Sequence, residues 1–392
     1  MVLPSSPLII PRANLPTPDA EALAHAGRVR AMLVDAIAAD GGFLPFARWM
    51  DLALYAPGLG YYAAGAAKLG AAGDFVTAPE LSPLFARTLA TDVAAILAAS
   101  PSREIVEWGA GSGRLAADLL AALDAAKVEI SRYAIVETSP TLRAQQRERL
   151  ASDDRVAWLD TPPTRIGGAV LMNEVLDAIP PALVARRDGR WLERGVVVAA
   201  DGAFAFADRP LADAALEAAA AARFPPAIDY ASEINFAAEA LVAQVAESLG
   251  EGAMLVIDYG FPRAEYYHPQ RAQGTLMAHY RHRASADVFL WPGLSDITAH
   301  VDFSAVAAAG ERGGLAVAGY TTQAAYLLGA GILDRLLDVG EPGTADFVRA
   351  TTAVQTLTSP AEMGDLFKVL ALSRSPAIRW RGFALGDKSP AL

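Results

Sequence analysis

The spacing of apolar positions changes near residue 100, and the part of the chain before this point is typical of helices. Apolar residues recur at helical spacing in three stretches: 19–39, 46–62 and 83–98. The second stretch ends in a Pro-Gly turn followed by aromatic residues. The first segment of the chain is rich in proline and breaks any such pattern. We therefore expect residues 1–100 to form an arm and a helical extension.

From residue 104 onward, short apolar runs alternate with helical stretches. The runs predict strands at 104–109, 133–139, 155–160, 168–173 and 253–260. The stretches between them predict helices at 114–126 and 141–152, and a short helix that ends before Pro180. Strands that alternate with helices form a parallel sheet, so the pattern indicates an α/β fold.

Two long segments interrupt this alternation, and we expect a core at 101–392 with insertions at about 182–250 and 261–300. The first insertion begins with β-type runs joined by Asp-Gly turns, which predict antiparallel hairpins at 184–210, and continues as a helix at 228–250. The second has little periodicity and many aromatic and histidine residues, and a loop of that length is usually functional.

The chain is expected to close with a further set of regular elements. Asp302 is placed to cap a helix at 303–311. A strand, a helix at 324–337 and a last strand at 367–374 follow. The pattern shows no internal repeat.

Composition narrows the class of protein. Of the 392 residues, 53% are apolar and 20% charged, which is a normal globular balance. The net charge of −11 comes without any basic stripe, so we expect no nucleic-acid partner. The absence of cysteine excludes disulfides, thiolate metal sites and a cysteine nucleophile. The start of the chain lacks a charged signal region and the apolar runs are too short for a bilayer, so we expect a cytoplasmic protein without membrane insertion.

The glycines of EIVEWGAGSGRL (104–115) are the sharpest local signal in the chain. A strand, a glycine turn and a helix bring free N–H groups and the helix dipole to a ligand. The dinucleotide pattern G-x-G-x-x-G fails here, because Arg114 takes the sixth place and the third glycine comes early. Gly109, Gly111 and Gly113 instead form E-x-G-x-G-x-G. The alternative is an ordinary turn between a strand and a helix.

Acids at three successive strand ends favour S-adenosylmethionine as the ligand of this turn. Glu107 can orient the amino group of the methionyl part, which the glycines let lie on the backbone. Glu137 ends the next strand, where a carboxylate accepts both ribose hydroxyls. Asp160 ends the third, where an acid can receive the adenine amine, although Asp before Thr-Pro-Pro is also ordinary turn chemistry.

Several segments together resemble the MidA-like family, whose mitochondrial members assist assembly of respiratory complex I. The matching segments are GDFVTAPELSPLF (73–85), EWGAGSGRL (107–115), NEVLDAIP (173–180), DYG (258–260), GTL (274–276) and DITAHVDF (296–303). The resemblance covers nearly the whole chain. It implies a Rossmann-like class I methyltransferase sheet with an N-terminal helical extension and an inserted hairpin and helical subdomain. The chain departs from the family's usual glycine turn at Ala110 and Ser112.

In the family, the best-described activity is symmetric dimethylation of an arginine in a complex I subunit. In this class of fold the end of the fourth strand faces the transferred methyl group, and here that end reads MNEVLDAIPP. Glu174 and Asp177 are three residues apart, so on a helical turn they share a face and can grip a guanidinium. Asn173 offers a carbonyl acceptor. Alternatively, Asn173 or Asp177 only caps the short helix.

Residues of the N-terminal extension and of the second insertion complete the predicted site. The extension is expected to cover the cofactor, with Asp74 and Thr77 near the methionyl end and Glu80 near the acceptor. Thr77 is alternatively a turn residue, and Glu80 alternatively favours the first turn of its helix. Tyr259 and His300 are predicted to contact the substrate, or to pack in the core.

Aromatic and histidine residues of the second insertion leave two further alternatives. Tyr266, Tyr267 and Tyr280 can stack on an arginine cation or simply pack their own loop. His279 and His282 are three residues apart, but no HExxH pattern accompanies them and methyl transfer to nitrogen needs no metal. We therefore expect no metal site.

The sequence thus favours an S-adenosylmethionine-dependent protein-arginine methyltransferase that acts on a complex I subunit or another protein. A small-molecule N- or O-methyltransferase on the same fold is an alternative, and so is a non-catalytic assembly factor that retains the cofactor site. The hairpins at 184–210 are a possible partner surface, homodimer interface or lid.

Overall fold

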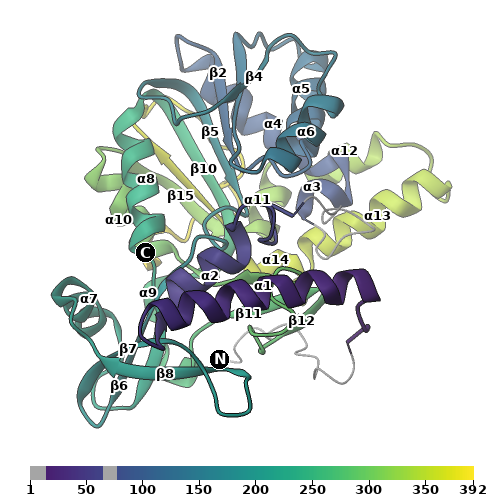
Figure 1. Ribbon diagram of the computed structural model, residues 1–392. Coiled ribbons are helices and arrows are strands. Elements are labelled where there is room, and N and C mark those ends of the chain that lie inside the picture. Colours follow the sequence, from purple (N-terminus) through teal and green to yellow (C-terminus); the bar gives the residue numbers. More distant parts are fainter. Residues whose placement is uncertain (1–14, 65–76) are drawn as a thin grey trace.

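A single mostly parallel sheet forms the centre of the protein in a computed structural model that describes residues 15–64 and 77–392 (Figure 1). The strands lie in the order β15–β16–β10–β5–β2–β3–β4. Their bounds are β2 (Glu104–Trp108), β3 (Arg132–Val136), β4 (Val156–Leu159), β5 (Ile166–Asn173), β10 (Leu249–Phe261), β15 (Ala316–Thr322) and β16 (Phe367–Ser373). The last strand inserts antiparallel between β10 and β15, while β4, β3, β2, β5 and β10 are parallel. The predicted α/β, Rossmann-like sheet is confirmed.

Helices cover both faces of this sheet, as Figure 1 shows. One face packs against α4 (Pro83–Ala98), α5 (Arg114–Ala125), α11 (Gln323–Gly329), α12 (Ile332–Leu337) and α13 (Ala345–Thr358). The other packs against α8 (Phe236–Ser248) and α10 (Phe303–Arg312). Adjacent strand residues such as Ile105 and Val106 therefore belong to different cores, which explains why the strands read as continuous apolar runs.

The N-terminal helices share a third core with the inserted sheet. This sheet contains β1 (Leu44–Pro45), β6 (Ala182–Arg187), β7 (Arg190–Val198), β8 (Phe204–Pro210) and β9 (Tyr230–Ile234), beside α7 (Ala214–Arg223). Leu44 pairs with Val196, so β1 extends the insertion. The helices α1 (Ala20–Ala39) and α2 (Phe46–Tyr55) bury Leu33 and Trp49 against this sheet. The helix α4 packs on the main sheet instead.

Three sequence expectations differ from the structure outside the main sheet. The stretch 228–250, expected to be helical throughout, begins with β9, because this segment pairs with β6, and only then becomes α8. The helix expected at 324–337 is divided by Gly331, whose φ of 90° ends one helix and starts the next. The helix α13 was not expected.

The segment 261–300 is more regular than its sequence predicts. It contains α9 (Arg263–Tyr266), a 3₁₀ turn η2 (Pro269–Arg271) and a small sheet. The strands of that sheet are β11 (Met277–Tyr280), β12 (Arg283–Ser285) and β13 (Asp296–Thr298). The remaining short elements are α3 (Ala78–Leu81), α6 (Pro140–Arg149), α14 (Met363–Leu366), β14 (Val301–Asp302) and η3 (Ser389–Ala391).

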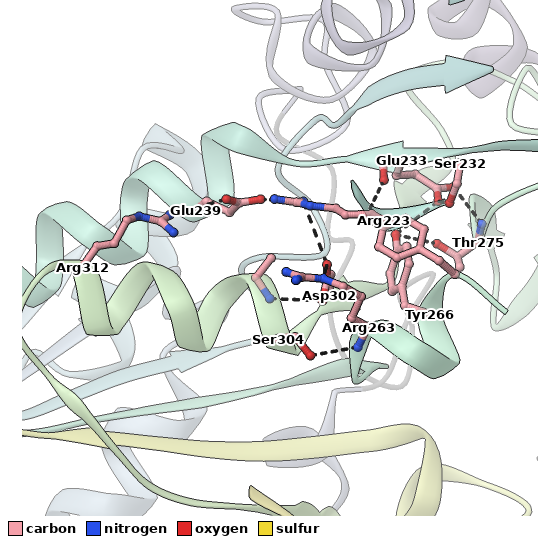
Figure 2. A network of polar contacts seen from close by, with 12 residues as sticks. Arg223, Ser232, Glu233, Glu239, Arg263, Tyr266, Thr275, Asp302, Ser304 and Arg312 are labelled. Carbon is pink, nitrogen blue, oxygen red and sulfur yellow. Dashed lines mark hydrogen bonds and ion pairs between the residues drawn. The ribbon is translucent and has the colours of Figure 1, made fainter. Parts of the chain in front are cut away.

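A polar network joins this segment to the inserted sheet and to α10 (Figure 2). Glu233 of β9 accepts hydrogen bonds from the Thr275 backbone N–H at 2.7 Å and from the Tyr266 hydroxyl at 3.2 Å. Asp302 accepts the Ala305 N–H at 3.1 Å, so the predicted cap of α10 is confirmed. Arg263 Nε lies 3.7 Å from Asp302 in the same network. Within the described residues, no helix is long and apolar enough to cross a bilayer.

Candidate active site

A cavity of about 870 Å³ opens at the carboxyl ends of β2, β3, β4 and β5. Its position follows from the strand order, because β2 lies between β3 and β5, where the direction of the chain's progress across the sheet reverses. This reversal creates the crevice in which α/β sheets bind ligands. The segments around α2 and α3 form the opposite wall, so the N-terminal part of the chain closes the cavity.

The glycine turn between β2 and α5 forms the floor of this cavity. Gly109, Gly111 and Gly113 have φ values of 61°, 55° and 78°, a region that side chains disfavour. A Cβ on Gly109 would lie 3.2 Å from the Val175 side chain, so space as well as backbone conformation requires glycine there. The bare backbone of the turn is thus open to a ligand at the start of α5.

Two of the predicted cofactor acids lie buried in the cavity with fixed orientations. Glu107 accepts the Tyr133 hydroxyl at 2.7 Å, and burial raises the pKa of its carboxyl to about 7 in spite of that hydrogen bond. Glu137 accepts the Ser139 N–H at 2.8 Å, and burial raises its pKa as well. Asp160 differs, since it is exposed at the edge of the cavity and pairs with Arg143 at 2.5 Å.

Gln146 of α6 does not line the cavity but contacts two parts of the candidate site, and the sequence did not predict this. Its Nε2 donates to the Gly111 carbonyl at 2.8 Å and to Glu137 at 3.0 Å. Its Oε1 accepts the indole N–H of Trp158 at 3.0 Å. One fully buried amide therefore ties the glycine turn to the acid of β3. The polar sequence around it gave no signal that this position is buried.

The predicted helix at the end of β5 is not formed, and an irregular turn takes its place. Asn173 and Asp177 therefore cap no helix, and Glu174 has a φ of 55°. The left-handed backbone of Glu174 interrupts a helix at this point, and Asp258 of β10 holds the turn, because its Oδ2 accepts the N–H groups of Leu176 at 3.0 Å and Asp177 at 3.3 Å. The carboxylate thus satisfies amides that a helix would leave without partners at its first turn.

The carbonyl side of the same turn is held by three other elements. The Ala299 N–H donates to the Asp177 carbonyl at 3.0 Å, and the Tyr55 hydroxyl donates to the Ala178 carbonyl at 2.9 Å. Asn235 donates to the carbonyl of Ile179 at 2.8 Å. The turn is consequently rigid although it lacks regular secondary structure.

This turn presents three buried oxygen atoms that have no hydrogen-bond partner among the described residues. They are Asn173 Oδ1, Glu174 Oε2 and Asp177 Oδ1, and all three residues line the cavity. Burial and the neighbouring Asp177 charge raise the pKa of Glu174 well above its usual value, and burial raises the pKa of Asp177 to about 6. A set of unpaired acceptors in a buried acidic place suits a cation with several N–H groups.

The aromatic wall of the cavity comes from the N-terminal extension and was not predicted. Tyr55, Tyr61 and Tyr62 line the cavity, and the rings of Tyr55 and Tyr62 stack with centroids 5.5 Å apart. The Tyr62 hydroxyl donates to both carboxylate oxygens of Asp296 at 3.0 Å, and Asp296 also lines the cavity. The signal for this wall was present as the aromatic residues after the Pro-Gly turn, but nothing local linked them to β5.

The aromatic residues predicted from the second insertion do not form this wall. Tyr266 and Tyr267 pack in the core beneath the inserted sheet, and Tyr280 packs against Trp291 with ring centroids 5.0 Å apart. His300 lines a separate cavity of about 370 Å³ and stacks on Phe261 at 5.3 Å. His300 does not line the main cavity, and Tyr259 contacts both its ring and the carboxylate of Asp177.

Only some of the other predicted residues line the main cavity. Thr77 and Glu80 line the main cavity, and Glu80 accepts a hydrogen bond from the Ser112 hydroxyl. Tyr259 does not line it but donates to Asp177 at 2.5 Å from behind. Asp74 lies outside the described residues. Within the described part of the chain, no group of three or more histidine, aspartate or glutamate side chains is placed to bind a metal.

The features of the cavity fit S-adenosylmethionine. A backbone of positive-φ glycines can accept the methionyl part, and the fixed, buried oxygens of Glu107 and Glu137 are acceptors for its amino group and ribose hydroxyls. With the strand order of the main sheet, this arrangement defines a Rossmann-like methyltransferase. A family model of S-adenosyl-L-methionine-dependent methyltransferases matches residues 84–321. The chain belongs to this family, as its MidA-like motifs indicated, and S-adenosylmethionine is its cofactor.

Curated relatives extend over most of the chain. The Drosophila melanogaster mitochondrial protein arginine methyltransferase NDUFAF7 homolog is 30% identical over 84% of this chain and 82% of its own length. The mitochondrial protein arginine methyltransferase NDUFAF7 of Danio rerio is 28% identical over 87% of this chain and 86% of its own length.

A solved structure from Burkholderia thailandensis, bound to S-adenosyl-homocysteine, is also similar. It is 52% identical, with a TM-score of 0.91, and the match covers 97% of this chain and 100% of that one. A native structure of a protein from the same organism has the same identity and a TM-score of 0.88. The likeness spans both the main sheet and the inserted parts, because nearly the whole chain is covered.

Proposed function

We propose that this methyltransferase transfers methyl groups to an arginine side chain of a protein. The observation that supports this proposal most directly is the set of buried oxygens on Asn173, Glu174 and Asp177, which have no hydrogen-bond partner among the described residues. A guanidinium has five N–H donors in a planar fork and remains cationic, so it can satisfy these acceptors together. The names of the curated relatives, which are protein arginine methyltransferases, support the same substrate class.

The cofactor would lie along the glycine turn, with residues of three strands around it. We assign its methionyl end to Glu107 and to the backbone of Gly109 and Gly111, with Thr77 on the opposite wall. Gly113 does not line the cavity and would act through the shape of the turn, since it packs against Gln146. We assign the ribose to Glu137, and the adenine end to the edge where Asp160 lies. When bound, the cofactor supplies an electrophilic methyl group on a sulfonium.

The acceptor would be held at the other end of the same cavity. Glu174 and Asp177 would bind the guanidinium nitrogens and concentrate electron density on the reacting one. The rigid turn fixes both side chains before the acceptor arrives, which reduces the cost of orientation. Tyr55 and Tyr62 present aromatic rings in the cavity, which can shield the aliphatic part of the arginine from water. Glu80 lines the cavity beside the glycine turn, where it accepts the Ser112 hydroxyl, and would contribute negative charge there.

Finer aspects of the function remain predictions of the sequence. They are symmetric dimethylation, a complex I subunit as the protein substrate, a cytoplasmic location and a homodimer. The relatives' names place those proteins in mitochondria. The division into an N-terminal extension at 1–100 and a core at 101–392 also remains a proposal.

The direct test incubates the protein with methyl-labelled S-adenosylmethionine and cell extract, followed by hydrolysis of labelled bands and analysis of their methylarginines. We expect label in arginine of a protein band, and none with Glu174→Gln, a variant of nearly equal size that lacks the negative charge. Label only in small molecules would favour a small-molecule methyltransferase. A Glu174→Gln variant that fully complements a gene deletion would favour a non-catalytic assembly role.

A further inference from the structure

Three carboxylates surround the turn at the end of β5, and their hydrogen bonds differ. Asp258 uses Oδ2 for the N–H groups of Leu176 and Asp177, and Oδ1 for the Tyr259 N–H at 2.9 Å. Asp258 does not line the cavity, so it shapes the turn without meeting the acceptor. Only Glu174 and Asp177 can touch the acceptor from this group.

The two remaining carboxylates are held in different ways. Glu174 uses Oε1 for the side-chain amide of Asn173 at 3.1 Å, a weak donor on the same turn. Asp177 uses Oδ2 for the hydroxyl of Tyr259 at 2.5 Å, which is a short bond to a buried partner. Asp177 thus has one oxygen fixed from behind and the other, Oδ1, without a partner among the described residues.

Tyr259 is itself held firmly in place. Its backbone continues β10, and its ring has edge contacts with His300 and Phe367 at centroid distances of 5.3 Å and 5.2 Å. Burial raises the pKa of the Tyr259 hydroxyl well above its usual value, so this hydroxyl keeps its proton and acts as a donor. A donor to the ionised form of Asp177 stabilises that form.

We propose that Asp177 is the general base that takes the proton lost by the acceptor nitrogen. Tyr259 is then the positioning residue that orients Asp177 and stabilises its ionised form. The assignment rests on the proposed function and deepens it. Glu174 then serves to hold the cation, while Asp177 Oδ1 is aimed at the reacting N–H.

The step balances as follows in atoms and charge. The acceptor nitrogen gives its lone pair to the new N–C bond, the electrons of the broken C–S bond stay on sulfur, and the N–H proton passes to Asp177 Oδ1. The proton is then released to solvent. The product guanidinium keeps its single positive charge, so the same carboxylates can bind the arginine before and after the transfer.

The charged and titratable groups around Asp177 come from several elements. They are Glu174 on the same turn, Asp258 and Tyr259 on β10, Tyr55 on α2, Tyr62 after it, and Asp296 on β13. None of these groups is a cation, so Tyr259 is the side-chain hydrogen-bond donor that favours the ionised form of Asp177 in this set. Removal of its hydroxyl should therefore make Asp177 harder to ionise.

The test compares the pH dependence of kcat/KM for an arginine peptide in wild-type protein and Tyr259→Phe. We expect the acid limb of the variant to move upward by about one pH unit, so that activity falls about fivefold at pH 6 and is nearly unchanged at pH 9. Asp177→Asn should be slow at every pH. Tyr230→Phe is the matched control, since it removes a tyrosine hydroxyl that donates to the backbone carbonyl of His268 at 3.2 Å, outside the cavity.

A second readout does not need the acceptor. The infrared C=O band of protonated Asp177, identified by its loss in Asp177→Asn, should titrate at higher pH in Tyr259→Phe than in wild-type protein. Unchanged midpoints in both measurements, or an activity loss that is equal at every pH, would overturn the assignment of Asp177. A wild-type protein that methylates no arginine at any pH would instead overturn the proposed function.

Discussion

The Oδ2 atom of Asp258 accepts the backbone N–H of Asp177 at 3.3 Å, so a residue of β10 shapes the turn that faces the acceptor. Asp258 is completely buried, and its second oxygen is also occupied by a backbone N–H. The sequence motif DYG therefore contributes twice, because Asp258 holds the backbone of the turn and Tyr259 holds a side chain on it.

Replacement of Asp258 by alanine should damage both stability and catalysis. Backbone N–H groups of the turn and of β10 would lose their acceptor, which should cost about 3 kcal/mol of unfolding free energy, measured by urea denaturation. A displaced turn should lower kcat roughly 100-fold in the folded protein. Asp92→Ala is the control, because Asp92 is equally buried and accepts two backbone N–H groups far from the cavity. Equal kcat losses in the two variants would contradict a role for Asp258 in the site.

Gly109→Ala should weaken cofactor binding more than its backbone strain alone explains. The new Cβ would lie 3.2 Å from Val175 in a backbone with φ of 61°, so the turn would have to move. We expect the affinity for S-adenosylhomocysteine, measured by calorimetry, to fall by roughly tenfold or more. Gly189→Ala has a similar φ of 74° and no atom within 4 Å of its Cβ, so it should lose a little stability and no affinity.

Glu107→Gln should stabilise the cofactor-free protein at alkaline pH. The pKa of Glu107 in the folded protein is about 7, above its usual value of 4.5. A raised carboxyl pKa means that its contribution to stability is complete below about 4.5 and is lost as the pH rises through about 7. At pH 8, urea unfolding should thus show the variant to be more stable than wild-type protein by about 1–3 kcal/mol, with little difference at pH 4.5.

The same variant should lose affinity for S-adenosylhomocysteine, because the neutral amide no longer attracts an ammonium group. Tyr133→Phe is informative beside it, since it removes the hydrogen bond that lowers the pKa of Glu107. That variant should be less stable than wild-type protein at pH 8. If Glu107→Gln changed the unfolding free energy equally at both pH values, ionisation of Glu107 would not be the cause of the stability difference.

Local sequence patterns predicted the parts of this molecule that depend on neighbours in the chain. The glycine turn and the acids at the ends of β2 and β3 could be read directly, because strand, turn and helix follow one another without interruption. Asn173 and Glu174 were also found, since they end a strand. Each of these residues is identified by its position at the end of one strand, so no contact between distant segments has to be known.

The missed features of the site depend on contacts between distant segments. Tyr62 meets Asp296 across 234 positions, and Asp258 acts on Leu176 across 82. The turn that replaces the helix expected after Asn173 also depends on a remote residue, because the carboxylate of Asp258 accepts two of its backbone N–H groups. Similarly, β9 became a strand only because β6 lies beside it. Periodicity records which face of an element is apolar and carries no information on which segment will cover it.

Gln146 offers the clearest test of such a hidden contact, and we expect Gln146→Leu to weaken cofactor binding. Leucine fills the space but leaves the Gly111 carbonyl and the Glu137 carboxylate without their donor. The affinity for S-adenosylhomocysteine should fall by about tenfold or more, because Glu137 would no longer be oriented toward the ribose. An analogue without ribose hydroxyls should show a much smaller loss, since that interaction is already absent. Gln323→Leu is the matched control: Gln323 is also fully buried and donates to the Leu357 carbonyl at 3.0 Å outside the cavity, so it should lower stability and leave affinity unchanged. An equal affinity loss for both ligands would show that Gln146 supports the fold and does not orient Glu137.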